Sequence, residues 1–248
     1  MNGTPRPGWP VLALMLVLSA LLGAAGYAAI ARLVPGASGD RARTEAIVRD
    51  YVLANPEILP EAMRNLADKE AGKAVAANRS RIITPFPGAE AGNPNGDVTV
   101  VAFMDYACGY CRASLPALAE LARSDGRVRI VYRELPILSP ASRSAAEWAL
   151  AAAQQGRFKA FHDALYAQGQ LDDGAVERAA AAAGIDRAAA ARVAQSQPVA
   201  QEIAGNLQLA GQLGMTGTPA WVVGDRVLNG VQSLEQLRAA VAAARKAG

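Results

Sequence analysis

The two cysteines of the chain, Cys108 and Cys111, are separated by Gly109 and Tyr110. This Cys-x-x-Cys spacing brings both sulfur atoms within disulfide distance when the second cysteine lies one turn into a helix. Unpaired N–H groups and the positive end of the helix dipole favour the thiolate form of the first cysteine. The pattern therefore indicates thiol–disulfide exchange, with Cys108 as the attacking thiol and Cys111 as the shielded, resolving thiol.

The spacing alone also fits a structural disulfide, half of a zinc site, or two small buried side chains. With two cysteines and one histidine in the sequence, a closed zinc site made from Cys and His lacks a fourth ligand. We expect neither a metal nor a cofactor. The histidine, His162, lies among apolar residues at helical spacing and is expected to pack rather than act as a base. Asp105 is expected either to influence the cysteines electrostatically or to cap the helix turn that follows.

A strand-to-helix junction is needed to place the cysteines. Residues 98–104 form a short β-branched, apolar run that is typical of a central strand covered on both faces. Residues 112–123 show helical periodicity and residues 127–133 read as a second strand. Together they predict a right-handed βαβ unit with Cys108 at the start of its helix.

The rest of this region is predicted to be a helical insertion followed by a hairpin. Residues 141–213 are rich in alanine and punctuated by glycine, which indicates several short helices. Two brief strands at 220–223 and 226–228 flank the turn Gly224-Asp225, and a capped helix follows over 233–246. Thr218-Pro219 directly precedes the hairpin, where a thioredoxin fold has a cis-proline beside its redox pair, so we expect a cis bond there.

The N-terminal residues 1–34 predict a signal anchor or a signal peptide. Residues 11–30 are almost wholly apolar and about long enough to span a bilayer. Ala29-Ile30-Ala31 would suit cleavage, but the apolar stretch is longer than a usual signal core, which favours an uncleaved anchor. Arginines after the segment outnumber those before it, which favours a cytoplasmic C-terminal part. We nevertheless expect export, because the cysteine chemistry suits an oxidising compartment.

A linker over 35–43 and a helical segment over 44–82 are predicted between this segment and the catalytic domain, 83–248. Asn55 and Pro56 would end one helix and begin the next. The large apolar residues of this helical segment are too sparse for it to fold alone. They fit equally well a helical appendage on the main domain and, over 44–78, a surface for homo-oligomerisation. Residues 84–97 are turn-rich and mark the domain boundary.

Residues 98–115, VTVVAFMDYACGYCRASL, resemble the active-site segment of the DsbA-like superfamily, in particular its Com1 and ScsC-type members. Similar stretches occur at 54–57, 133–138, 158–162 and 217–219, so the resemblance covers about residues 44 to 246. It implies an α/β thioredoxin fold with an inserted all-helical domain. It also implies that Cys108 and Cys111 are catalytic and that substrate is contacted by four residues, Gly109, Tyr110, Thr218 and Pro219.

The expected function is therefore that of an exported, periplasmic thiol:disulfide oxidoreductase, anchored by its N-terminal helix. Its partners would be unfolded or misoxidised exported proteins and a DsbB-like or DsbD-like membrane protein. Oxidase, isomerase and reductase directions stay open, because the Gly-Tyr dipeptide lacks the histidine of the strongest oxidants. The competing class is a membrane-tethered chaperone or peptide-binding module with a structural disulfide. A net charge of +3 without long basic runs argues against nucleic acid.

Overall fold

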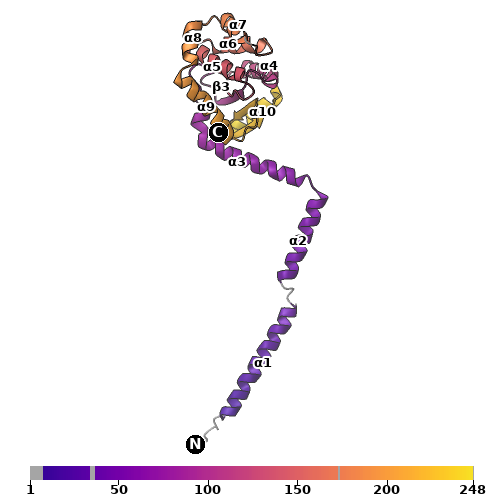
Figure 1. The fold of residues 1–248 in the computed structure, drawn as a ribbon. Helices are drawn as coiled ribbons and strands as arrows, with labels where there is room; N and C mark the ends of the chain where they lie inside the picture. Colours follow the sequence, from indigo (N-terminus) through magenta and orange to yellow (C-terminus); the bar gives the residue numbers. More distant parts are fainter. Residues whose placement is uncertain (1–7, 34–36, 173, 248) are drawn as a thin grey trace. The chain divides into compact units, whose positions relative to one another are not determined.

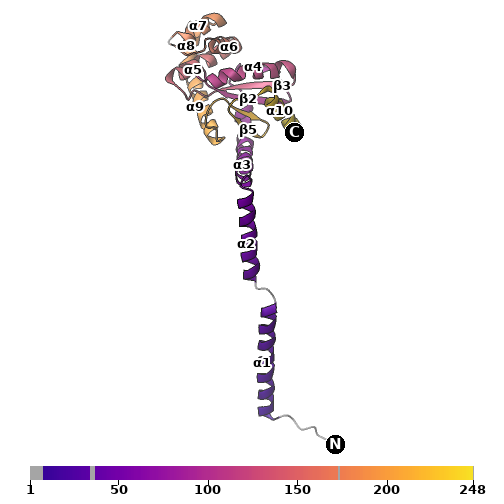
Figure 2. The ribbon, with the colours of Figure 1, turned by 90° about the vertical axis from the view of Figure 1, so that its right-hand side faces the viewer.

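The computed structural model describes residues 8–33, 37–172 and 174–247. The chain divides into two compact units, Met1–Arg64 and Asn65–Gly248. The ribbon is shown in Figure 1 and, turned by 90°, in Figure 2.

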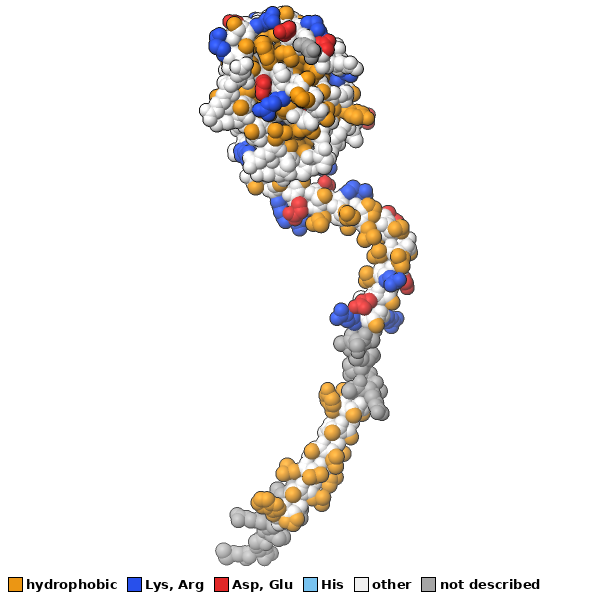
Figure 3. All heavy atoms as spheres, viewed as in Figure 1, with side chains coloured by type: hydrophobic (Ala, Val, Ile, Leu, Met, Phe, Trp, Pro, Cys, Tyr) orange, Lys and Arg blue, Asp and Glu red, His pale blue; other side chains and the backbone are white. Residues whose placement is uncertain are grey.

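The N-terminal unit is helical. It contains α1 (Trp9–Leu33), α2 (Ala37–Ala54) and the start of α3 (Ile58–Ile83). Within α1, the window Ala13–Ile30 has a mean hydropathy of 2.1 and is long and apolar enough to cross a membrane. Hydrophobic side chains cover the face of α1 that is visible in Figure 3.

The predicted boundaries of this unit need two corrections. The segment 35–43 was expected to be a linker, but α2 already begins at Ala37; residues 34–36 lie outside the described residues. Inside this helix, the Thr44 hydroxyl donates a hydrogen bond to the Asp40 carbonyl at 2.7 Å. Asn55 does not cap α3, because its side-chain amide donates to the carbonyl of Tyr51 at 2.8 Å and so closes the end of α2.

The second unit is built on a five-stranded mixed sheet among the described residues, with strand order β1-β3-β2-β4-β5. The parallel pair β2 and β3 lies at its centre, and the other neighbours are antiparallel. The strands are β1 (Glu90–Gly92), β2 (Val98–Met104), β3 (Val128–Glu134), β4 (Ala220–Val223) and β5 (Arg226–Asn229).

Helices connect and cover these strands (Figure 2). The crossover helix of the predicted βαβ unit is α4 (Gly109–Ser124), and α10 (Leu234–Ala247) closes the chain. Ser233 caps α10, since its hydroxyl accepts the N–H of Gln236 at 3.2 Å. The stretch predicted as a helical insertion contains α5 (Pro140–Gln154), α6 (Phe158–Ala167), α7 (Ala175–Ala183), α8 (Arg187–Ala194) and α9 (Gln197–Gln212).

Both faces of the central strands are buried, as expected for a β-branched run without alternation. Val100 and Ala102 point into the larger core, which also holds both cysteines and the apolar sides of α4, α5 and α6. Val101 and Phe103 point into a second core, where they meet residues of α3 and α9. The C-terminal part of α3 is thus a covering layer of the catalytic domain.

Strand β1 was not predicted, because residues 84–97 read as a turn-rich boundary. Its three residues pair antiparallel with β3, with Glu90 opposite Val131 and Gly92 opposite Arg129. So short a strand has no hydrophobic period of its own. It exists because the exposed edge of β3 offers hydrogen-bonding partners.

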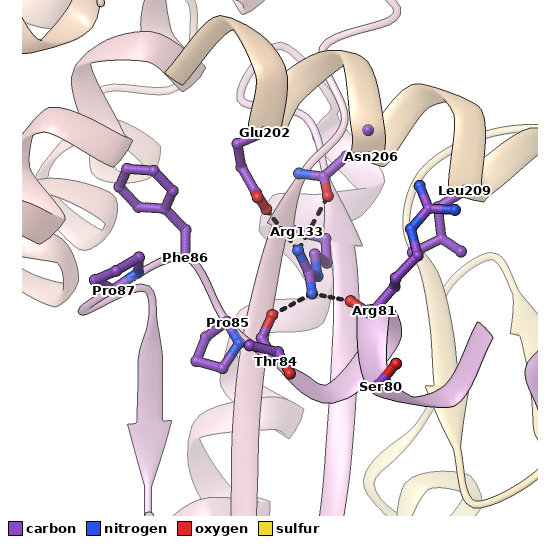
Figure 4. A pocket seen from close by; sticks show the side chains of 11 residues that line it. Ser80, Arg81, Thr84, Pro85, Phe86, Pro87, Arg133, Glu202, Asn206 and Leu209 are labelled. Atoms are coloured by element: carbon purple, nitrogen blue, oxygen red, sulfur yellow. Dashed lines mark hydrogen bonds and ion pairs between the residues drawn. The ribbon is translucent and has the colours of Figure 1, made fainter. Parts of the chain in front are cut away.

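Arg133 of β3 is a buried cation on the second face of the sheet (Figure 4). Its guanidinium pairs with Glu202 of α9 at 2.5 Å and donates to the carbonyls of Arg81 and Thr84 at the end of α3. Helix-end carbonyls carry the negative end of the dipole, so the cation ties α3 and α9 to the sheet. A cavity of about 420 Å³ lies beside this cluster.

Candidate active site

Cys108 occupies the N-cap of α4, immediately after the turn that leaves β2. Its Sγ accepts the backbone N–H of Cys111 at 3.3 Å, so one orphan N–H of the helix start points at the sulfur. Cys108 is 6% exposed and Cys111 is fully buried. The predicted geometry is therefore found, with the first cysteine nearer to solvent and at the positive end of the helix.

The predicted cis bond between Thr218 and Pro219 is also found. The Thr218 carbonyl lies beside the first cysteine and accepts a hydrogen bond from the Cys108 thiol at 3.2 Å. Within the described part of the chain, the buried Thr218 hydroxyl has no hydrogen-bond partner. The loop before β4 and the start of α4, 110 residues apart, thus meet at Cys108.

Burial strongly raises the pKa of the Cys111 thiol, although a backbone group of Asp105 and the Thr218 hydroxyl oppose the rise. A thiolate at Cys111 is therefore poorly solvated. In the dithiol form, in which both cysteines are free, Cys111 is expected to be protonated.

Gly109 and Tyr110 form the exposed start of α4, and the Tyr110 side chain is 71% exposed. Next to them, the Arg112 guanidinium lies near Gly109 and donates to the carbonyl of Gly169, in the loop after α6. The helical insertion therefore reaches the redox motif. This contact was not predicted, because a glycine carbonyl in a loop leaves no side-chain signal in the sequence.

Asp105 does not cap α4, and its side chain is hydrogen-bonded elsewhere. Its buried carboxylate accepts the N–H of Ala107 at 2.8 Å, and those of Ile137 and Leu138 at 2.8 and 2.9 Å. Its carbonyl accepts the N–H of Cys108 at 3.1 Å. Asp105 thus joins the cysteine turn to the loop between β3 and α5.

A second polar cluster lies in the larger core. The Tyr106 hydroxyl donates to Oε1 of Glu134 at 3.1 Å and lies 3.0 Å from Nδ1 of His162. All three side chains are buried. His162 packs among rings, as predicted, but it also belongs to this polar cluster. His162 is enclosed by Tyr106, Tyr132, Phe158 and Tyr166.

Burial dominates the electrostatics of this cluster. It raises the pKa of Glu134 well above its ordinary value of 4.5, although the bond from Tyr106 favours the carboxylate. It lowers the pKa of His162 to about 3, assisted by Lys159. His162 is therefore neutral near pH 7, and burial favours the neutral carboxyl form of Glu134. Perturbed groups of this kind often gather at functional sites.

The described ranges contain no group of three or more His, Cys, Asp or Glu side chains placed to hold a metal ion. The cavity beside Arg133 lies on the sheet face away from the cysteines, since Arg133 and Glu134 point to opposite faces.

Two family models match the chain. The DSBA-like thioredoxin domain matches residues 99–242, which include both cysteines and Pro219. The N-terminal domain of the copper resistance protein ScsC matches residues 40–72, which lie in α2 and α3.

Solved structures give the same result. A thioredoxin-like oxidoreductase from Silicibacter pomeroyi DSS-3 is 42% identical, with 69% of this chain and 99% of that chain covered and a TM-score of 0.66. A ScsC variant from Proteus mirabilis is 26% identical over 87% and 99% of the two chains, with a TM-score of 0.68. The thiol-disulfide exchange protein α-DsbA2 from Wolbachia pipientis is 28% identical over 70% and 95%, with a TM-score of 0.64.

Among curated proteins, the Na(+)/H(+) antiporter NhaA 3 of Salinispora tropica is 36% identical over 150 residues, or 59% of this chain. The chain spans only 23% of the length of that relative. This match concerns a part of the antiporter and says nothing of transport by this chain. The family model covers more than half of the chain and includes the redox motif, and the chain belongs to the DSBA-like thioredoxin domain family.

Proposed function

We propose that this protein is an exported thiol:disulfide oxidoreductase that acts through Cys108 and Cys111. The observation that carries the proposal is the position of the Cys108 sulfur, which meets a helix-start N–H on one side and the Thr218 carbonyl on the other. Thiolates at helix starts are stabilised, and exchange requires a thiolate.

The proposed reaction begins with the disulfide form. A substrate thiolate attacks the Cys108 sulfur, the Cys108–Cys111 bond breaks, and Cys111 leaves with the electron pair. A second substrate thiolate then attacks the substrate sulfur of the mixed disulfide and releases Cys108. The substrate gains a disulfide and the cysteine pair is reduced. The same steps in reverse reduce or rearrange a substrate disulfide.

Substrate is proposed to bind across the loop that holds Thr218 and Pro219, together with Gly109 and Tyr110. An extended chain pairs well with exposed backbone groups, as in strand addition. The exposed Tyr110 ring supports a contact with apolar side chains of an unfolded substrate.

Localisation in the periplasm, with α1 as an anchor, is part of the proposal. It is supported by the span Ala13–Ile30 and by the similarity to a periplasmic thioredoxin-like protein from Salmonella enterica, 27% identical with a TM-score of 0.62. A DsbB-like or DsbD-like membrane protein would then set the direction of exchange by oxidising or reducing the pair.

Self-association through residues 44–78 is a further part of the proposal. Large apolar side chains are exposed on α2 and on α3, which is costly for a monomer in water. They are Ile47, Val48, Tyr51, Leu53, Leu59, Met63 and Leu66. Sedimentation of the full chain in detergent, with and without Tyr51→Ser and Met63→Ser, tests this. An equal, monomeric mass for both proteins would refute it.

The function itself is tested by equilibrating the full chain with glutathione buffers and trapping the cysteines by alkylation. We expect a reversible transition between disulfide and dithiol. A disulfide that resists these buffers and yields no reactive thiol would instead support the chaperone or peptide-binding alternative with a structural disulfide.

A further inference from the structure

The cavity of about 420 Å³ beside Arg133 takes no part in the exchange reaction proposed above, because it lies on the sheet face away from the cysteines. It is lined by the C-terminal end of α3, by the loop 84–89 that follows and by α9. The side chain of Arg133 rises from β3 between α9 and the end of α3 (Figure 4). The chemistry of this lining indicates what the cavity can bind.

Arg133 brings to the cavity a buried cation with one unused donor. Its side chain is 5% exposed. Nη1 donates to Glu202 and Asn206 of α9, and Nη2 donates to backbone carbonyls at and just after the end of α3. Nε is buried and has no hydrogen-bond partner in the described part of the chain. An unpaired buried donor on a charged group is costly, so a ligand that accepts from Nε is favoured.

The charges of the lining favour an anion. The guanidinium groups of Arg81 and Arg133 and the carboxylate of Glu202 all line the cavity. Arg81 donates to Gln208 of α9 at 3.3 Å, which keeps this second cation beside α9. Because Glu202 balances the charge of one guanidinium, the other leaves a positive excess.

Much of the remaining lining is apolar. An apolar group on the ligand would leave water when it contacts this part of the cavity. The apolar side chains are those of Pro85, Phe86, Pro87 and Leu209. The hydroxyl groups of Ser80 and Thr84 also line the cavity and are further donors for an anion. The cavity therefore suits a small ligand with an anionic end and an apolar end.

Gly205 leaves the α9 side of the cavity open. It lies inside α9 and lines the cavity, and a Cβ added there would meet nothing within 4 Å. Its φ is not positive, so neither the backbone nor a close contact requires glycine at this position. Glycine inside a helix is less favourable than alanine. A larger side chain at 205 would occupy part of the cavity.

We propose that this cavity binds a carboxylate that carries a short apolar group, either a free carboxylic acid or the C-terminal residue of a polypeptide. A carboxylate oxygen accepts the Nε–H of Arg133, and the apolar group packs against Phe86 and Leu209. The bonds from Nη1 to Glu202 and Asn206 stay in place. A bare anion such as phosphate would leave the apolar lining uncovered. Binding here does not depend on the exchange reaction.

Nuclear magnetic resonance of the full-length chain, labelled with ¹⁵N and held in detergent micelles, tests the proposal through the arginine Nε–H signals. The signal of Arg133 is identified by its loss in Arg133→Lys. We expect acetyl-alanyl-leucine with a free carboxylate to shift this signal. The same peptide with a C-terminal amide should bind at least about tenfold more weakly, because the charge-assisted hydrogen bond is lost. Phosphate, which gains no apolar contact, should also bind at least about tenfold more weakly.

Gly205→Leu is the blocking variant, because it fills the cavity without removing a hydrogen bond. We expect it to fold, to bind the peptide at least about tenfold more weakly and to exchange disulfides with glutathione as wild type does. Gly211→Leu is the matched control. Gly211 also lies inside α9 with nothing within 4 Å of an added Cβ, but it does not line the cavity. This variant should bind the peptide as wild type does.

A second carboxylate, 4-methylpentanoate, distinguishes the two sources of the ligand. If it binds as tightly as the peptide or more tightly, the ligand is a free carboxylic acid; weaker binding assigns a polypeptide C-terminus. The proposal is overturned if neither carboxylate shifts the Arg133 signal, if the amide or phosphate binds as well as the free peptide, or if Gly205→Leu binds like wild type. Failure of wild type to exchange with glutathione would instead refute the proposed function and leave this site untouched.

Discussion

Arg133 and Glu134 are consecutive residues of β3, and both side chains are buried, one on each face of the sheet. Arg133 holds the end of α3 and Glu202 of α9. Glu134 accepts a hydrogen bond from Tyr106, which lies in the larger core. One short stretch of strand therefore anchors the covering helices on one face and supplies Glu134 to a buried polar cluster on the other.

We predict that Arg133→Met lowers the free energy of unfolding by about 1 to 3 kcal/mol, because the partly exposed Glu202 and the carbonyls of Arg81 and Thr84 lose their partner. Urea denaturation measures the change. Arg129→Met is the matched control on the same strand; its pair with Glu90 is partly exposed, so we expect a loss of at most about 1 kcal/mol. Equal losses in the two variants would contradict this account of Arg133.

His162 should make the protein sensitive to acid. Its pKa is about 3 when folded against an ordinary 6.5, so the unfolded chain binds a proton that the folded chain does not. Stability is therefore present above about pH 6.5 and is lost as pH falls toward 3, by up to about 1.4 kcal/mol per pH unit.

The variant His162→Phe removes this titration and fits the aromatic surroundings. At neutral pH we expect it to be less stable by about 1 kcal/mol, since the bond to Tyr106 is lost. The deficit should shrink as the pH is lowered from 7 to 4 in urea denaturation. A deficit that is constant with pH would show that His162 does not titrate as described.

The two cysteines should differ in their variants. Cys108→Ser should abolish exchange, because Cys108 is the partly exposed sulfur at the helix start. Cys111→Ser should retain attack but accumulate mixed disulfides, because the resolving thiol is missing. Non-reducing gels with an unfolded substrate that contains non-native disulfides measure both, since the Cys108 thiolate can attack a substrate disulfide. Alkylation of Cys111 before Cys108 at acidic pH would reverse the assignment.

Thr218→Val should raise the free energy of unfolding and slow the opening of the disulfide. It removes a buried hydroxyl that has no partner in the described part of the chain, so we expect unfolding to cost about 1 kcal/mol more. A thiolate at Cys111 would give this unpaired hydroxyl an acceptor, so its removal should slow opening of the disulfide by glutathione. Thr218→Ser keeps the hydroxyl and should retain the wild-type opening rate. A Val variant as fast as the Ser variant would exclude a role for the hydroxyl.

Local patterns were sufficient for the elements that carry their own signal. The β-branched run of β2, the periodic helix after Cys108 and the turn at Gly224-Asp225 were all predicted, and all are found. Local signals were insufficient for β1 and for the start of α2. The three residues of β1 are too few to show a hydrophobic periodicity. The helical residues from Ala37 onward were mistaken for a linker, because Pro35 and Gly39 in the sequence suggested a loop.

By itself the sequence determined the redox pair, the βαβ unit that presents it and the apolar N-terminal helix, because each is encoded within a few turns of chain. Tertiary structure alone decided what surrounds the pair. Glu134 and His162 lie 28 and 56 residues from their partner Tyr106 along the chain. Asp105 accepts a hydrogen bond from Ile137, which is 32 residues away. Such contacts depend on which strands pair and which helix covers them. Burial then sets the protonation of Glu134 and His162, and burial is a property of the packed fold, not of the local sequence.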